Sequence, residues 1–188
     1  MQEGDREILE KINKEIGSNK PLRYIHYEYG IEKYGLKMQN QYRLTVSSHI
    51  MSQALASHGC VKTKSLILKF PELPSNLYSH FLRGYFDGDG TLYKGPRNDK
   101  PFDNYDVSLI STNDFLEEAQ KCIINHTGVS GGTITIPSCD NGITRVLIFG
   151  GRIQTKTILD WFYKDADLYL KRKYDKYLSY YENNSQIA

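Results

Sequence analysis

Residues 82–90 read LRGYFDGDG. Gly84 and Gly88 are four positions apart, so a helix would place both on one face. Each glycine inside a helix costs about 1 kcal/mol relative to alanine. A bare face offsets that cost when it lets a second backbone approach closely. We therefore predict a helix from Leu77 to Gly90 that packs through Gly84 and Gly88 against a partner helix.

Two aspartates, Asp87 and Asp89, lie in the last turn of this predicted helix. The C-terminal end of a helix carries partial negative charge, so two carboxylates there repel that end and each other. A bound divalent cation would relieve both repulsions. Two such helices packed side by side would bring one acid from each tip over a shared cation. The spacing therefore predicts a metal site at the paired helix tips.

The rest of the chain predicts a mixed α/β fold. Apolar residues at helical spacing indicate further helices over 5–17, 48–58 and 114–126, and a last helical region from Arg152. We expect Asp5 to cap the first of these helices, and Thr112 or Asn113 to cap the helix over 114–126. Alternating residues indicate strands in RYIHYEY and QYRLTVS, and over 91–95, 105–111, 132–137 and 143–149, the last two joined by the turn CDNG. From Leu77 onward the predicted order is α-β-β-α-β-β-α.

Three segments of the first half recur in the second half in the same order, each about 105 residues later. Leu9 in EILEK matches Leu116 in DFLEE, Leu44 in YRLTVSS matches Leu147 in RVLIFGG, and Lys62 in CVKTK matches Lys171 in YLKRK. Chance similarity between common α/β patterns is the alternative. A duplication predicts a first subdomain over 1–70 without its opening helix, a linker over 71–76, a complete second subdomain over 77–183 and a tail over 184–188.

The stretch LRGYFDGDG resembles, position by position, the nine-residue motif of the LAGLIDADG homing endonucleases. The small third and seventh positions of that motif match Gly84 and Gly88, and its metal-binding acid matches Asp89. Asp87 is then expected beside the metal site, and Arg83, which replaces the motif's alanine, at an outward position. The resemblance implies an α+β fold built from α-β-β-α-β-β-α units with curved antiparallel sheets.

The resemblance also implies an activity: site-specific hydrolysis of double-stranded DNA, normally with Mg²⁺, by a protein associated with introns or inteins. Two motif helices form the central interface of this family, either within one chain or across a homodimer. A homodimer through Gly84 and Gly88 is therefore one expectation, and a monomeric, truncated form of a two-motif enzyme is the alternative. The family's catalytic basic residue, after the last strands, matches Lys171, with Lys62 as its first-half counterpart; a solvated basic face is the alternative for both. With one motif in the sequence, we expect weak or absent cleavage by this chain.

The strands offer a surface for DNA independently of the resemblance. On QYRLTVS, the apolar residues Tyr42, Leu44 and Val46 should face the helices and leave the polar ones on an open face. Side chains of Arg, Gln and Thr can reach phosphates and base edges in the major groove. The expected DNA-contacting residues are Gln41, Arg43, Thr45, Thr133, Thr135, Arg145 and Lys173. Most solvated sheet faces have a similar composition, so this pattern alone does not show DNA binding.

Other interpretations of the motif are weaker. FDGDGTL also resembles the DxDGT signature of haloacid-dehalogenase-type phosphatases, with Asp87 as nucleophile, but that signature must follow a buried strand. An EF-hand does not fit, because Gly90 comes two positions too early and the final glutamate is missing. A protein that binds DNA or RNA without cutting it, such as an intron maturase, is the principal alternative function.

Composition agrees with a globular protein inside the cell. The chain of 188 residues is 39% hydrophobic and 24% charged, with a net charge of +2. No run of about eighteen apolar residues predicts a membrane span, and the charged start is unlike a secretory signal. The three cysteines, Cys60, Cys122 and Cys139, lack metal-type spacing and are expected to be reduced. We therefore expect a cytoplasmic protein, or an organellar one if an organelle encodes it.

Overall fold

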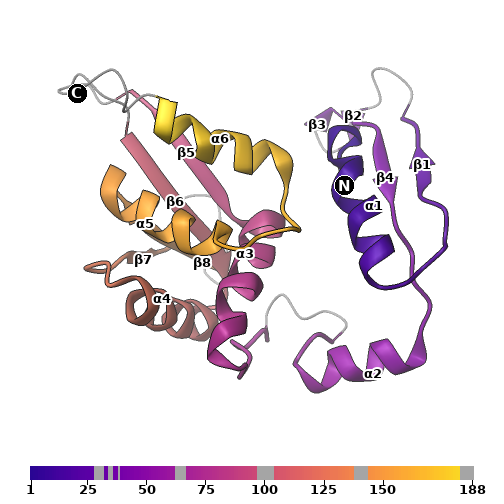
Figure 1. Cartoon of the computed structure of the whole chain (residues 1–188), viewed down its shortest axis with the longest axis horizontal. Helices are drawn as coiled ribbons and strands as arrows, with labels where there is room; N and C mark the ends of the chain where they lie inside the picture. The colour runs from indigo at the N-terminus through magenta and orange to yellow at the C-terminus, as the bar shows by residue number, and fades with distance from the viewer. Residues whose placement is uncertain are drawn as a thin grey trace.

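The second half of the chain has the predicted order of elements. A computed structural model describes residues 1–27, 32–33, 36–37, 39–61, 67–96, 104–137 and 144–182. Its second half comprises, after a 3-10 turn at Ser75–Leu77, α3 (Tyr78–Asp89), β5 (Thr91–Gly95), β6 (Asn104–Ser111), α4 (Asn113–Thr127), β7 (Thr133–Thr135), β8 (Arg145–Gly150), α5 (Arg152–Tyr163) and α6 (Lys171–Glu182) (Figure 1). The prediction α-β-β-α-β-β-α is confirmed, with α6 added at the end.

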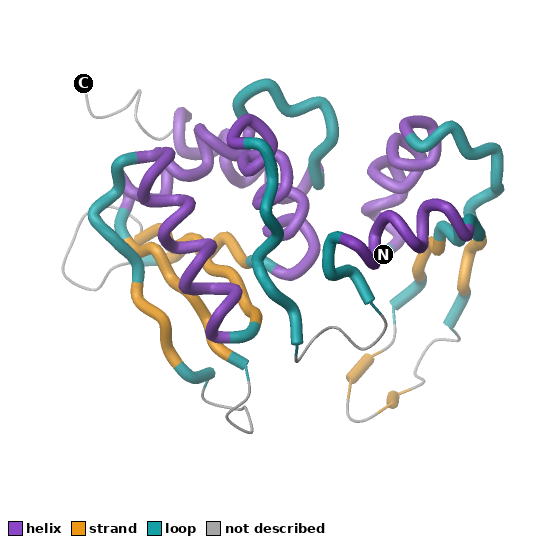
Figure 2. The backbone as a smooth tube through the Cα atoms, turned by 90° about the horizontal axis from the view of Figure 1, so that it is seen from below, coloured by secondary structure: helices purple, strands orange, loops and turns teal. Residues whose placement is uncertain are grey.

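The four strands of this half form one antiparallel sheet in the order β5-β6-β8-β7. Successive side chains of a strand point to opposite faces of a sheet, and on β6 every second residue, from Tyr105 to Ser111, is buried. Helices cover this buried face, as Figure 2 shows. Fully buried side chains fill the layer between helices and sheet: Leu82, Phe86, Phe115, Leu116, Leu147, Phe149, Ile158, Leu159 and Phe162. The sheet therefore has one packed face and one open face.

The first half is smaller. It comprises a 3-10 turn (Glu3–Asp5), α1 (Arg6–Glu15), β1 (Arg23–Ile25), β2 (Glu32–Lys33), β3 (Leu36–Lys37), β4 (Gln41–Arg43) and α2 (His49–Ser57). β1 and β4 pair antiparallel, and α1 lies against them with the Arg6 guanidinium 5.2 Å from the Tyr42 ring centre. The strand predicted over QYRLTVS is correct at its start but ends at Arg43. The CDNG turn predicted in the second half lies outside the described residues.

The helix caps explain where several helices begin and end. The Thr112 hydroxyl accepts a hydrogen bond from the Phe115 N–H at 3.3 Å, so Thr112 is the cap of α4, and Gly128 ends that helix with a φ of 71°. Asp5 occupies the cap position of α1 but its carboxylate makes no cap bond. The carboxylate accepts instead from Arg172, at the start of α6. A long-range contact has therefore replaced the predicted local one.

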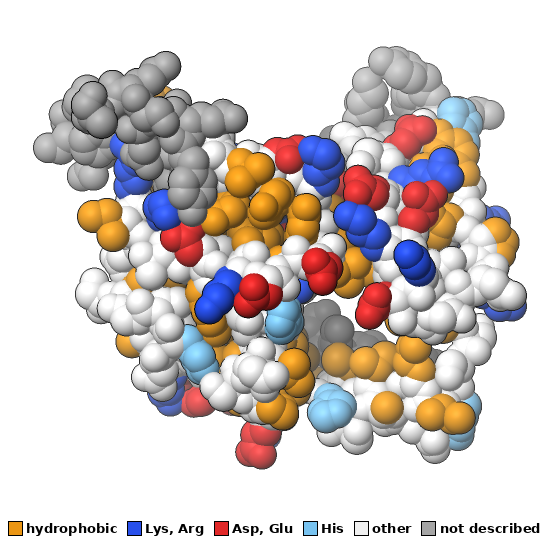
Figure 3. All heavy atoms as spheres, viewed as in Figure 1, with side chains coloured by type: hydrophobic (Ala, Val, Ile, Leu, Met, Phe, Trp, Pro, Cys, Tyr) orange, Lys and Arg blue, Asp and Glu red, His pale blue; other side chains and the backbone are white. Residues whose placement is uncertain are grey.

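Apart from the short strands β2 and β3 between β1 and β4, the elements α1, β1, β4 and α2 occur in the same order as α4, β7, β8 and α5. The two last helices differ in their surroundings, because α5 buries Ile158 and Leu159 whereas no described residue of α2 is buried. Ile50 on α2 is 81% exposed, and apolar side chains lie along this helix in Figure 3. The apolar face of α2 is thus uncovered in the described part of the chain.

Among the described residues, no helix is both long and apolar enough to span a membrane. Cys60 and Cys122 are free thiols, and Cys139 lies outside the described residues.

Candidate active site at the end of helix α3

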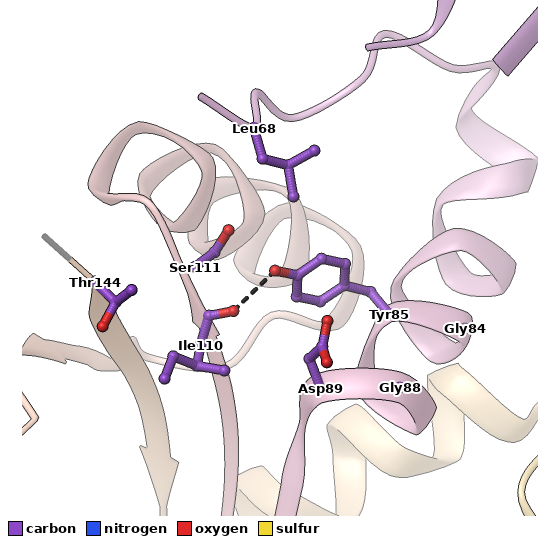
Figure 4. Close-up of a pocket in the computed structure, with 8 residues that line it drawn as sticks. All are labelled: Leu68, Gly84, Tyr85, Gly88, Asp89, Ile110, Ser111 and Thr144. Carbon is purple, nitrogen blue, oxygen red and sulfur yellow. Dashed lines mark hydrogen bonds between the residues drawn. The ribbon is translucent and has the colours of Figure 1, made fainter. Parts of the chain in front are cut away.

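The predicted metal ligand Asp89 ends α3 at the surface. Its side chain is exposed and lines a cavity of about 410 Å³ together with Leu68, Gly84, Tyr85, Gly88, Ile110, Ser111 and Thr144 (Figure 4). The Tyr85 hydroxyl donates to the Ile110 carbonyl oxygen at 2.8 Å and so ties α3 to β6 beside Asp89. An exposed carboxylate beside a cavity can bind a cation without losing a protein partner.

The glycine face of α3 is open. Gly84 and Gly88 are both exposed, and a Cβ added at either would meet nothing within 4 Å. Within the described part of the chain, therefore, no helix packs on this face. The predicted partner helix is not supplied there, and close packing through Gly84 and Gly88 stays a prediction.

Asp87 points away from the cavity. Asp87 is 9% exposed, and its carboxylate accepts hydrogen bonds from the Leu170 N–H at 2.9 Å and the Tyr163 hydroxyl at 3.5 Å. Burial raises the pKa of Asp87, although the Leu170 N–H and the nearby cations Lys173 and Arg83 oppose this rise. The segment before Asp87 is a helix rather than a buried strand. The phosphatase interpretation, which needs that strand and a nucleophile facing a cleft, is therefore wrong.

Lys173 differs most from the prediction. We expected it to contact DNA, but it is 5% exposed, and its ammonium group donates to the carbonyl oxygens of Phe86, of Asp87 at 3.1 Å and of Gly90 at 2.6 Å. Burial lowers the pKa of Lys173 to about 8, and Asp87 and Asp89 oppose this shift. An ammonium group enclosed in this way cannot reach a phosphate, so the DNA-contact prediction for Lys173 is wrong.

The position of Lys173 also bears on the predicted metal site. From the sequence LRGYFDGDG, we expected a bound metal cation to relieve the repulsion of Asp87 and Asp89 by the helix end and by each other. The structure supplies a cation of the protein itself at this end, hydrogen-bonded to the carbonyl groups of the last turn. Asp87 is thus accounted for by the fold, and only the exposed Asp89 is left as a ligand candidate. Leu170 and Tyr177, buried three before and four after Lys173, are the helical signal that this lysine points inward.

The position of Arg83 also differs from the prediction. We expected it at an outward position, but it is 6% exposed. Its guanidinium donates to the carbonyl oxygens of Leu168 at 2.9 Å and Phe162 at 3.1 Å. It therefore fastens α3 to the end of α5 and the segment that follows, and burial lowers its pKa while Asp87 opposes this.

Lys171 does not line the cavity that contains Asp89. Its ammonium group donates to the Asp175 carboxylate at 2.6 Å, one turn further along α6, and its side chain is 65% exposed. Hydrogen bonding to Asp175 raises the pKa of Lys171. Its counterpart Lys62 lies outside the described residues. The catalytic role predicted for both lysines stays a prediction.

The open face of the four-stranded sheet holds Thr133 and Thr135, which are exposed as predicted. Their partners across the sheet are Ile148 and Val146, so this face is partly apolar. Arg145 pairs with the buried Ser111 and follows the alternation onto the helix-covered face, where its guanidinium donates to the Thr144 carbonyl oxygen. The prediction that Arg145 lies on the open face is wrong, because Leu147 and Phe149 face the helices and Arg145 lies on the same side of β8.

The other DNA-contact predictions fall on the first half. Gln41 is half-buried, and Arg43 and Thr45 are exposed. In the described strands of the four-stranded sheet, no lysine or arginine lies on the open face. Among the predicted DNA-contacting residues, Arg43 is therefore the positively charged side chain that is exposed.

Comparisons with known proteins place the fold. No protein-family model matches the chain, and no curated protein matches it significantly. The solved structure of the meganuclease I-SmaMI bound to uncleavable DNA is similar over 97% of this chain and 76% of that one, with a TM-score of 0.57 and 12% identity. A point mutant of I-SmaMI is similar over 97% and 77%, with the same TM-score and identity. I-CvuI in complex with its target is 20% identical over 47% of this chain, with a TM-score of 0.37, and the match spans 55% of I-CvuI.

I-SmaMI is a LAGLIDADG homing endonuclease. At 12% identity the likeness concerns the fold, and it extends along nearly the whole chain. The protein has the mixed α/β fold of the LAGLIDADG homing endonucleases, as the motif at 82–90 predicted.

Proposed function

We propose that this protein is a metal-dependent endonuclease of the LAGLIDADG type, which hydrolyses double-stranded DNA at a specific site. The observation that carries the proposal is the exposed Asp89 carboxylate at the tip of α3, beside a helix face kept bare by Gly84 and Gly88. In the described chain nothing packs on the glycine face, and the exposed Asp89 contributes to the fold through its attraction to the buried Lys173. The fold shared with I-SmaMI, whose structure contains DNA, supports the same function.

The residues present fit half of a magnesium site. Mg²⁺ is bound through oxygen, commonly by one or two carboxylates together with water and substrate phosphates. Asp89 would supply one carboxylate, and the described residues contain no group of three metal-ligating side chains. Mg²⁺ would activate water and neutralise charge on the phosphate. We propose that the other carboxylate comes from a second motif helix packed on Gly84 and Gly88.

A second copy of this chain is the proposed source of that helix, which would make the active form a homodimer. In the same proposal, residues 1–70 form the later elements of a first unit, because α1-β1-β4-α2 repeats the order of α4-β7-β8-α5. DNA would contact the open sheet faces through Gln41, Arg43, Thr45, Thr133 and Thr135. Lys62 and Lys171 are proposed to support the reaction.

The test begins with binding. The protein is used to enrich duplexes from a randomised DNA library, and the enriched sequences are then incubated with the protein and Mg²⁺. We expect salt-dependent binding of particular duplexes and slow cleavage that requires Mg²⁺. The variant Asp89→Asn should bind the same duplexes with unchanged affinity and show no cleavage. Glu15→Gln, an exposed carboxylate at the end of α1, is the control and should cleave like the original chain.

Each outcome decides between functions. Sequence-selective duplex binding without cleavage, also at protein concentrations at which the chain dimerises, would favour the non-catalytic nucleic-acid-binding alternative. Enrichment of RNA but not of duplex DNA would favour the maturase form of that alternative. Loss of binding together with cleavage in Asp89→Asn would assign Asp89 a structural role.

A further inference from the structure

Lys173 holds the end of the helix that carries Asp89. The last carbonyl groups of a helix lack partners within the helix, and an ammonium group has three N–H donors. In this structure those donors meet the carbonyl oxygens of Phe86, Asp87 and Gly90. Asp89 itself lies between the last two of these residues. Lys173 therefore bonds the backbone on both sides of the candidate metal ligand: at Gly90, which follows Asp89, and at Asp87, two residues before it.

Holding the helix end in this way has a cost. Moving an ammonium group out of water is unfavourable unless it is well paired, and water could satisfy the carbonyl groups at an exposed helix end without that cost. Here the negative helix end and Asp87 offset the burial of the charge, and the ammonium nitrogen also lies 4.5 Å from the centre of the Phe86 ring. Unlike water, a single buried ammonium group bonds three carbonyl groups at once and so ties them to one another.

The turn after the helix is also sterically restricted. Gly90 is extended, with φ −85° and ψ 167°, and a Cβ at this position would come within 2.5 Å of the Phe86 ring. The chain therefore leaves α3 and enters β5 within one residue. A second bond from the same region, from the Leu170 N–H to the Asp87 carboxylate, fixes the other side of the turn. Leu170, just before α6, and Lys173, in the first turn of α6, thus both bond this helix end, and the start of α6 lies beside α3 in Figure 1.

We propose that Lys173 is a positioning residue that directs the Asp89 carboxylate into the cavity shown in Figure 4. This inference rests on the proposed function, because it assigns Lys173 a role at the same site. Lys173 acts through the backbone on either side of Asp89 and does not touch the metal or the DNA.

The first measurement is hydrogen exchange of the backbone amides near the end of α3. In Lys173→Met, we expect exchange in residues 86–92 to become at least threefold faster, with α4 unchanged. The matched control is Lys176→Met, because Lys176 lies on the same helix and donates to one carbonyl oxygen, that of Leu92 on β5. This control should leave the exchange of 86–90 unchanged. Equal exchange in Lys173→Met and the original chain would overturn the proposal.

The second measurement uses Tb³⁺ as a metal probe, since Tyr85 lines the same cavity as Asp89 and can sensitise Tb³⁺ luminescence. Lys173→Met should weaken the Asp89-dependent part of the Tb³⁺ titration by at least threefold, and Lys173→Arg should restore at least half of the loss. Removal of a positive charge without any positioning effect would instead strengthen Tb³⁺ binding. Unchanged or tighter binding in Lys173→Met would therefore contradict the proposal.

The same titration separates this inference from the proposed function. Asp89→Asn should remove a saturable part of the Tb³⁺ signal in the original chain. If it does not, the metal role of Asp89 fails, and the exchange measurement still decides whether Lys173 holds the helix end. Should Lys173→Met fail to fold, Lys173→Gln takes its place in both measurements, with the same expected results.

Discussion

Three ionisable side chains are buried where α3 meets α6 and the segment before it. Arg83, Asp87 and Lys173 are each less than a tenth exposed, and each has hydrogen-bond partners in the segment after α5 or at the end of α3. A buried charge is tolerated when it is paired and hydrogen-bonded. Loss of one partner leaves the others uncompensated, so these residues belong to the stability of the fold.

Arg83→Ala should therefore destabilise the protein. The substitution leaves the carbonyl groups of Leu168 and Phe162 without their donor and the buried Asp87 with one cation fewer. We expect the free energy of unfolding to fall by about 2–4 kcal/mol, measured by urea denaturation. Arg23→Ala, on an exposed arginine of β1, is the comparison and should change the free energy of unfolding much less. An Arg83→Ala protein as stable as the original would show that the guanidinium is not needed inside.

At the scale of elements, α3 has two faces with opposite properties. One face is packed against the sheet and α5 through Leu82 and Phe86, which are completely buried. The other carries Gly84 and Gly88 and has nothing of the described chain within reach of an added Cβ. A helix that retains two costly glycines on a bare face is suited to close contact with another helix.

Gly84→Ala should have opposite effects on folding and on association. In the monomer the added methyl group meets open space, so the free energy of unfolding should rise by about 1 kcal/mol through helix propensity. In a dimer paired through this face the methyl group would separate the helices, so light scattering should show weaker self-association. Ser52→Ala, on the exposed α2, should not affect association. A fall in stability at low protein concentration would mean that the glycine face is already packed within one chain.

At the scale of the whole molecule, the two halves meet where α1 approaches the start of α6. Asp5, which is 7% exposed, accepts from Arg172 at 3.3 Å, and the Lys11 ammonium nitrogen lies 5.4 Å from the centre of the Tyr169 ring. Arg172 and Lys173 are neighbours, so one turn of α6 contacts both the first half and the tip of α3. The placement of the first half and that of the candidate site therefore depend on the same turn.

Arg172→Ala should loosen the contact between the two halves. The Arg172 side chain is 54% exposed, and an ion pair of this kind contributes on the order of 1 kcal/mol. We expect small-angle X-ray scattering to show a larger radius of gyration, while circular dichroism shows unchanged helix content. Lys164→Ala, on an exposed lysine after α5, should leave the radius unchanged. An unchanged radius in Arg172→Ala would show that other contacts suffice to hold the halves together.

The amino-acid sequence determined the local features of this protein. Hydrophobic periodicity gave the order of elements, because side chains alternate in strands and recur every three to four residues in helices. Thr112 and Gly128 set the ends of α4 through bonds and backbone conformations that depend on adjacent residues alone. Helical spacing likewise placed Gly84 and Gly88 on one face of α3.

The tertiary structure decided which polar side chains turn inward. Lys171 and Lys173 belong to one basic stretch, and only the docking of α6 on α3 makes Lys173 a buried partner of carbonyl groups while Lys171 pairs with Asp175 at the surface. Asp5 exchanged a predicted cap for Arg172, and the pairing of β6 with β8 placed Arg145 on the covered face. Each outcome depends on a partner distant in the chain. Spacing within one segment can indicate that a side chain points inward, as Leu170 and Tyr177 do for Lys173. It does not identify the distant partner, which only the folded molecule shows.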